Sequence, residues 1–169
     1  MNKKVTFGTS GHRGVIEKTF TIKQVEAIAY AVADFVHSKN GTTIALGYDP
    51  RYGNSPSLAN DSFTKTIADV ITKAGVDLHI FDTFTPTPLV SWYITNKNIA
   101  GGLILTASHN PAEYNGLKFN PDNGAPAPPM VTALIEQTAN RYLFENMEKT
   151  LFKKQKGLIK KINAEKEFS

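Results

Sequence analysis

The strongest constraint on the fold is an alternation of short apolar runs with longer segments of helical periodicity. Runs typical of strands lie at residues 4–7, 43–48, 76–81 and 102–107. Helical spacing is found at residues 21–40, 57–74, in a short segment from Pro88, and at 130–144. This alternation indicates a largely parallel sheet with helices on both faces. We therefore expect a three-layer α/β/α domain with a mostly parallel, mixed sheet, in which residues 117–119 are a candidate edge strand.

The first helix has the clearest end signals. Its apolar residues recur every three or four positions, so they lie on one stripe. Thr21 and Gln24 fit a capping box at its start, and Gly41 follows its end. Gly75 is the corresponding stop signal for the second helix.

The composition is that of a folded protein. Hydrophobic residues make up 41% and charged residues 20% of 169 residues, and a chain of about 150 residues buries roughly 70% of its unfolded surface. There is no cysteine, which excludes disulfides and thiolate metal sites. The start MNKKVTFGTSG lacks a signal peptide's apolar region, and no run approaches the roughly 18 apolar residues of a membrane helix. We expect a cytoplasmic protein that does not bind membranes.

The positive charge is concentrated at the C-terminal end. Residues 1–144 hold 12 basic and 11 acidic side chains, whereas residues 145–169 hold 7 and 4. A nearly neutral body argues against a nucleic-acid partner. We expect residues 1–145 to form one domain and residues 146–169 to be a basic linker, or an amphipathic helix that lacks its partner.

Three loops are expected at the carboxyl edge of the sheet, where open parallel sheets bind ligands. They are residues 8–14, residues 49–55 and the loop that begins at Ser108. Arg13 in the first loop suits phosphate, but the glycine spacing fits neither a dinucleotide site nor a P-loop, and a purely structural turn explains it equally well. In the second loop, an Asp49–Arg51 pair that closes a turn is the favoured interpretation.

The third loop lies in the stretch LILTASHNPAEYNGLKF at 103–119 and carries the residues that are most informative about a reaction. A serine hydroxyl is a weak nucleophile that needs exposure, nearby cations or a base to take part in group transfer. Ser108 follows a strand, and a turn at Asn115-Gly116 would bring Lys118 back towards it. The residues alone equally allow an ordinary loop hydroxyl bonded to backbone.

Several motifs together resemble the first domain of the α-D-phosphohexomutase family, the phosphoglucomutases and phosphomannomutases. They are TASHNP and NGLK around Ser108, FGTSGHRG at 7–14 and FTPTP at 84–88, and the similarity covers residues 4 to about 140. The resemblance implies that Ser108 carries a phosphoryl group, that Lys118 is a general base or acid with Arg13 beside it, and that His109 supports the site. The candidate substrate-binding residues are Ser10, Asn110 and Asn115. FGTSGHRG and NPDNGAPA are most similar to the bacterial glucose-phosphate branch, with mannose or glucosamine phosphate as open alternatives.

The resemblance also implies groups that this chain does not contain. The family reaction needs Mg²⁺, which Ser108 would bind through its phosphate, and passes through a hexose 1,6-bisphosphate that also acts as activator. The family's Asp-Gly-Asp-x-Asp-Arg metal motif and Gly-Glu-x-Ser-Gly sugar loop are absent from the sequence. Because family members are about three times as long, in four domains, we expect this chain to be their N-terminal domain. Alone it should fold but turn over little or no hexose phosphate, its partners being that substrate and the C-terminal domains of the same enzyme.

Two other functions are compatible with parts of the sequence. One is a stand-alone sugar-phosphate-binding or regulatory module without turnover. The other is a serine hydrolase, which is disfavoured because no G-x-S-x-G elbow is present and His109 is adjacent to Ser108 in sequence.

Overall fold

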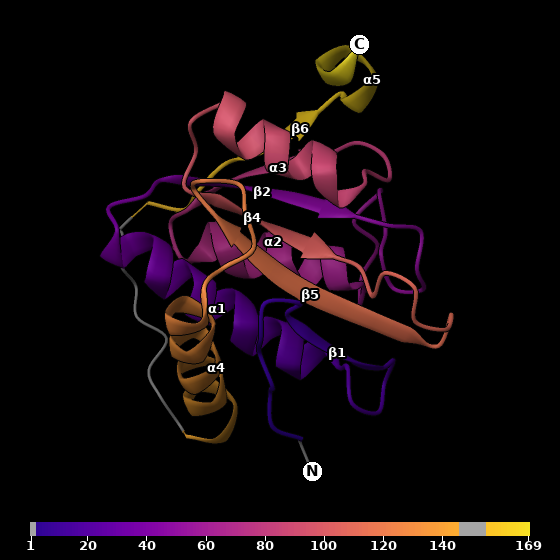
Figure 1. Cartoon of the computed structure of the whole chain (residues 1–169), viewed down its shortest axis with the longest axis vertical. Coiled ribbons are helices and arrows are strands. Elements are labelled where there is room, and N and C mark those ends of the chain that lie inside the picture. Colours follow the sequence, from indigo (N-terminus) through magenta and orange to yellow (C-terminus); the bar gives the residue numbers. More distant parts are fainter. Residues whose placement is uncertain (1–2, 146–154) are drawn as a thin grey trace.

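The computed structural model describes residues 3–145 and 155–169 and forms an α/β domain (Figure 1). The strands are β1 (His12–Val15), β2 (Thr43–Tyr48), β3 (Asp77–Phe81), β4 (Gly101–Leu105), β5 (Tyr114–Pro121) and β6 (Ile159–Ile162). The helices are α1 (Ile22–Ser38), α2 (Phe63–Lys73), α3 (Thr87–Asn96), α4 (Pro129–Phe144) and α5 (Ala164–Phe168). None of the helices in the described ranges is both long and apolar enough to cross a membrane.

All six strands form one mixed sheet in the order β1-β5-β4-β2-β3-β6. Strands β4, β2, β3 and β6 are parallel to one another, whereas β5 runs antiparallel to both β4 and β1. The expected mixed sheet with a parallel majority is therefore confirmed.

Helices cover both faces of this sheet, which confirms the three layers (Figure 1). Helices α1, α2 and α4 lie on one face, over a large apolar cluster that includes Ile28, Leu46 and Leu103. Helices α3 and α5 lie on the opposite face, over a smaller cluster that includes Phe81 and Tyr93. A double-sided apolar cover is what a parallel sheet requires.

Helix α1 begins as predicted, whereas α2 begins later. The side chain of Thr21 accepts a hydrogen bond from the backbone of Gln24, and the Gln24 side chain accepts one from the backbone of Thr21, which completes the capping box. The second helix was expected from residue 57, but its N-cap is Ser62. Leu58 and Asp61 have φ values of 56° and 63°, and this left-handed backbone cannot continue a right-handed helix.

The expected strand at residues 4–7 is wrong, although its apolar side chains are buried as a strand's would be. Val5 exchanges hydrogen bonds of 2.7 and 2.9 Å with the side-chain amide of Asn140, and the backbone N–H of Phe7 donates to Glu136 at 2.7 Å. Side chains of α4 thus satisfy backbone hydrogen-bonding groups of this segment, and the strand forms instead at β1, which overlaps the loop expected at residues 8–14.

The expected edge strand at residues 117–119 belongs to the longer strand β5, which lies inside the sheet between β1 and β4. Asn115 and Gly116 were expected to form a turn but lie within β5, paired with Gly14 and Arg13. The chain reverses earlier, at residues 106–113 between β4 and β5.

The described part of the expected linker is not a linker in this structure. Strand β6 pairs in parallel with β3, and α5 follows it. The Phe168 ring packs on Phe81 and Trp92, and Lys97 forms a 2.7 Å ion pair with Glu167. Residues 146–154 of that expected linker lie outside the described residues.

Candidate active site

Ser108 lies in the loop of residues 106–113, which we call the serine loop, just beyond the carboxyl end of β4. Its side chain is exposed, and its φ of 52° places it in the left-handed region, which costs a non-glycine residue energy. Strand β2 runs parallel to β4 and ends beside it, so residues 49–51 lie at the same edge. The structure therefore holds a hydroxyl in a strained conformation at the edge where such sheets bind ligands.

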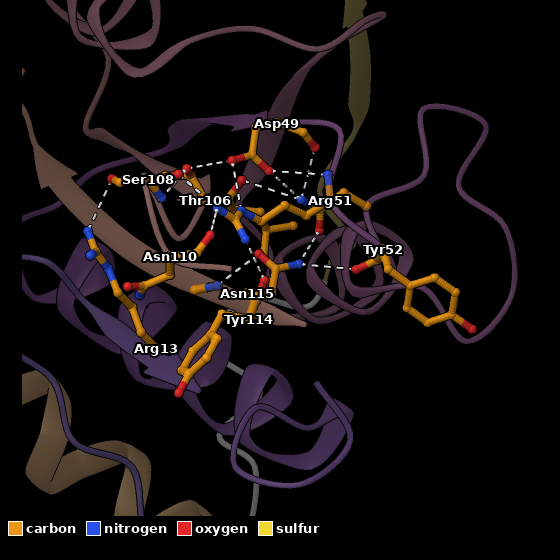
Figure 2. A network of polar contacts seen from close by, with 12 residues as sticks. Arg13, Asp49, Arg51, Tyr52, Thr106, Ser108, Asn110, Tyr114 and Asn115 are labelled. Carbon is orange, nitrogen blue, oxygen red and sulfur yellow. Dashed lines mark hydrogen bonds and ion pairs between the residues drawn. The ribbon is translucent and has the colours of Figure 1, made fainter. Parts of the chain in front are cut away.

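Arg13 on β1 reaches this hydroxyl. Its Nη2 donates to Ser108 Oγ at 3.2 Å (Figure 2). Its Nε is buried and has no hydrogen-bond partner among the described residues. A guanidinium with unused donor capacity beside a serine is a suitable anion contact.

Lys118 lies on the same face of the sheet as Arg13. Arg13 is directly opposite Gly116 in the β1–β5 ladder, and Lys118 is two residues farther along β5, so their side chains share a face. Burial lowers the pKa of Lys118, and the positive charge of Arg13 lowers it further. A half-buried amine with a lowered pKa releases and accepts protons more readily near neutral pH.

Gly116 on β5 leaves the space that the Arg13 side chain occupies. A Cβ atom at this position would lie 2.9 Å from Arg13 Cγ and 2.5 Å from the carbonyl oxygen of Thr106. A side chain at this position would therefore displace either the arginine or the backbone of the serine loop.

Arg51 holds the serine loop through hydrogen bonds to its backbone. Its Nη atoms donate to four backbone carbonyls, those of Ser108, Asn110, Pro111 and Tyr114, at 2.7 to 2.9 Å (Figure 2). Its Nε contacts Asp49 Oδ2 at 3.4 Å, which confirms the expected Asp49–Arg51 pair.

Further polar side chains complete the support (Figure 2). Thr106 donates to Asp49 Oδ2 at 2.6 Å and accepts from the backbone N–H of Ser108 at 3.0 Å. Asn115 is fully buried, and its amide donates to Asn54 Oδ1 at 2.9 Å. Asn54 in turn donates to the carbonyl oxygen of Asp49 at 3.0 Å.

The other expected site residues differ in their exposure to solvent. Ser10 is exposed in the turn before β1, and His109 is exposed on the serine loop. Asn110 is half-buried, with its backbone N–H bonded to the carbonyl of Ala107. The structure thus brings Arg13 into contact with Ser108, places Lys118 on the same face of the sheet as Arg13, and buries Asn115 inside the fold.

Within the described ranges, no group of three or more His, Asp or Glu side chains is arranged to hold a metal ion. The carboxylate of Asp49, beside the serine loop, is bound by Arg51 and Thr106. These residues alone do not fit a magnesium site, which usually needs one or two free carboxylates with phosphate oxygens.

The family model for the phosphoglucomutase/phosphomannomutase alpha/beta/alpha domain I matches residues 4–146. The chain belongs to this family. A phosphoglucomutase from Komagataeibacter xylinus is 35% identical over 156 residues, covering 86% of this chain and 27% of the relative. A phosphoglucomutase from Staphylococcus aureus (strain bovine RF122 / ET3-1) is 32% identical over 146 residues, covering 84% and 25%. The chain therefore spans about a quarter of the length of these relatives.

Solved structures agree with this membership of the mutase family. A structure from Thermus thermophilus described as a phosphomannomutase superposes with a TM-score of 0.78 at 29% identity, over 96% of this chain and 34% of that one. A phosphoglucomutase/phosphomannomutase family protein from Burkholderia thailandensis gives a TM-score of 0.75 at 20% identity, over 97% and 35%, which supports the fold.

In this mutase domain, sequence reasoning missed the supporting roles of Thr106 and Asn54, and above all that of Arg51. Its position two residues after Asp49 predicted the ion pair but not the four carbonyl contacts. Backbone acceptors carry no side-chain signature, so the only available signal was the position of Arg51 at the end of a strand that neighbours β4.

Proposed function

We propose that this chain is the phosphoserine-bearing domain of an enzyme that interconverts hexose 1-phosphate and hexose 6-phosphate. The observation that carries the proposal is the 3.2 Å contact from Arg13 to the exposed hydroxyl of Ser108, with Lys118 on the same face. Family membership supports the reaction class, and relatives described as phosphoglucomutases make glucose phosphate the first substrate to test. Mannose and glucosamine phosphates are the comparison substrates.

In the proposed reaction, Ser108 begins as a phosphoserine. A hydroxyl of the sugar monophosphate attacks the phosphorus, the bond from phosphorus to Ser108 Oγ breaks, and a hexose 1,6-bisphosphate forms. After the sugar turns over, Ser108 Oγ attacks the other phosphoryl group, the bond from that phosphorus to its sugar oxygen breaks, and the phosphoserine is regenerated as the isomeric hexose monophosphate leaves. Such transfers depend chiefly on in-line positioning and on charge neutralisation.

Lys118 and Arg13 take separate roles in these steps. Lys118, whose lowered pKa increases the fraction of neutral amine, accepts the proton of the attacking sugar hydroxyl and returns a proton in the second half-reaction. Arg13 remains cationic and binds phosphoryl oxygens. His109 supports the phosphoserine, and Ser10 and Asn110 face the sugar phosphate. Buried Asn115 supports the substrate site through Asn54 and the loop of residues 49–55.

The charges of this chain are insufficient for the whole reaction. A phosphoserine carries about −1.5 to −2 charge, and two like unit charges 4 Å apart repel by about 4 kcal/mol at an effective dielectric constant near 20. Arg13 supplies one permanent positive charge, and Lys118 adds a second only while it is protonated. The remaining neutralisation is assigned to further domains of the same enzyme and to Mg²⁺, for which the phosphoryl oxygens on Ser108 are this chain's contribution.

The test is mass spectrometry for phosphate on Ser108 in a longer, active form of the enzyme, together with Ser108→Ala. The variant should lose mutase activity, whereas Ser57→Ala, at another exposed loop serine, should retain it. Activity that survives in Ser108→Ala contradicts the proposal. Full activity from the 169 residues alone contradicts the assignment of the missing charges to other domains.

A further inference from the structure

Arg51 uses every donor of its guanidinium inside the fold. The group has five N–H donors in a rigid plane. The two Nη atoms donate to four carbonyl oxygens of the serine loop, and Nε contacts Asp49. The Arg51 side chain is only 12% exposed. It therefore has no donor free for a substrate, in contrast to Arg13.

The four carbonyls span the loop from one end to the other. Ser108 lies at its start and Tyr114 is the first residue of β5, so one guanidinium ties the beginning of the loop to its end. Carbonyl oxygens that converge on one point repel one another unless a cation lies between them. The compact shape of the loop therefore requires a positive charge with several donors at this position.

The backbone of Ser108 is held on both sides by one connected network. Its N–H donates to Thr106 Oγ1 at 3.0 Å, and its carbonyl accepts from Arg51 at 2.7 Å. Thr106 and Arg51 both bind Asp49 Oδ2, which closes the ring of contacts. This ring stabilises the left-handed conformation of Ser108 and leaves its side chain directed at Arg13.

We infer that Arg51 is a positioning residue for phosphoryl transfer, acting by holding the serine loop, residues 106–113, so that Ser108 Oγ stays in line for attack. This inference rests on the proposed function. In-line transfer is sensitive to small displacements, since a shift of about 1 Å can reduce a rate about 100-fold. Lysine cannot replace the arginine, because its three donors radiate from one nitrogen and cannot reach four carbonyls in a plane.

The test compares Arg51→Lys with Arg141→Lys, a control at an exposed arginine whose contact is to Glu145. In the 169-residue chain, hydrogen exchange is measured for the hydrogen-bonded amides of Ser108, Asn110 and Tyr114 and for helix α1. Arg51→Lys should accelerate exchange in the loop by at least about tenfold and leave α1 unchanged. In a longer, active enzyme, the same change should lower kcat about 10- to 100-fold and alter KM by less than about threefold.

Each alternative result overturns the inference. Unchanged loop exchange in Arg51→Lys means that the loop holds its shape without the guanidinium fork. A loosened loop with normal kcat means that the held shape is not needed, and a rise in KM alone means that Arg51 binds substrate. Fast exchange in α1 as well as in the loop means that the role is global. Retained activity in Ser108→Ala would instead refute the proposed function and leave the exchange result standing.

Discussion

Gly116→Ala offers a direct test of how tightly the sheet and the serine loop are packed. The added Cβ would lie 2.5 Å from the carbonyl oxygen of Thr106, 2.9 Å from Arg13 Cγ and 3.3 Å from the carbonyl oxygen of His12. Two of these three contacts are with backbone oxygens, one in β1 and one at the start of the serine loop, and backbone cannot move as a side-chain tip can. The arginine must therefore leave its position, or β5 must separate from its neighbours.

The expected loss of stability follows from two opposing terms. Overpacking a well-packed site costs about 1–3 kcal/mol, and replacing glycine with alanine in a strand recovers about 0.5–1 kcal/mol of backbone entropy. The central values of these terms, about 2 and 0.75 kcal/mol, leave a net loss of about 1.2 kcal/mol. For a domain of this size, the melting temperature should fall by about 2–5 °C.

The matched control is Gly8→Ala, because a Cβ at Gly8 would have no heavy atom within 4 Å. Its melting temperature, measured by thermal unfolding followed by circular dichroism, should be equal to or slightly above that of the unmodified chain, because the entropy gain acts there without overpacking. Equal melting temperatures for the two variants would refute the account of Gly116 as the space that Arg13 requires.

Three further predictions concern single side chains. Thr106→Val keeps the shape of the side chain but loses its hydrogen bonds to Asp49 and to the backbone N–H of Ser108. It should lower the free energy of unfolding, measured by urea titration, by about 1–3 kcal/mol. An unchanged value would show that the network contributes nothing to stability. Burial raises the pKa of Asp34, so the folded state holds a proton that the unfolded state has released, and stability should fall as pH rises from 3.8 through that raised pKa. Melting temperatures across that range should show the slope, and Asp34→Asn should abolish it; a slope that persists would assign it to other groups. Arg13→Gln should raise the pKa of Lys118 but leave it below 10.5, because burial is the larger cause of the lowered pKa. The rate at which the Lys118 amine is acylated, followed against pH, measures that pKa. An unchanged value would show that Arg13 does not affect the pKa of Lys118.

Local patterns were sufficient to predict the elements that carry their own signals. The capping box at Thr21 and Gln24 places the start of α1, and the apolar runs place β2, β3 and β4. These features depend on residues close together in sequence. Strand β1 was missed because its four residues have no distinct pattern and its ladder partner β5 lies about a hundred residues later.

Tertiary contacts explain the other differences. Asn115-Gly116 has a typical turn composition, but burial of the Asn115 side chain against Asn54 fixes these residues in a strand. The lysine-rich C-terminal segment has the composition of a linker, but Ile162 is buried beside β3. In the site, Ser108 and Arg13 were found through motifs, whereas the acceptors of Arg51 are backbone atoms that no motif records.

The pairing of β6 with β3 has a consequence for synthesis on the ribosome. Leu158 bonds to Asp77 across 81 positions of sequence. At about 5–20 residues per second, β3 waits about 4–16 s for its neighbour to be translated. During that interval the nascent chain carries an open strand edge beside Leu78 and Ile80, the kind of surface that chaperones bind.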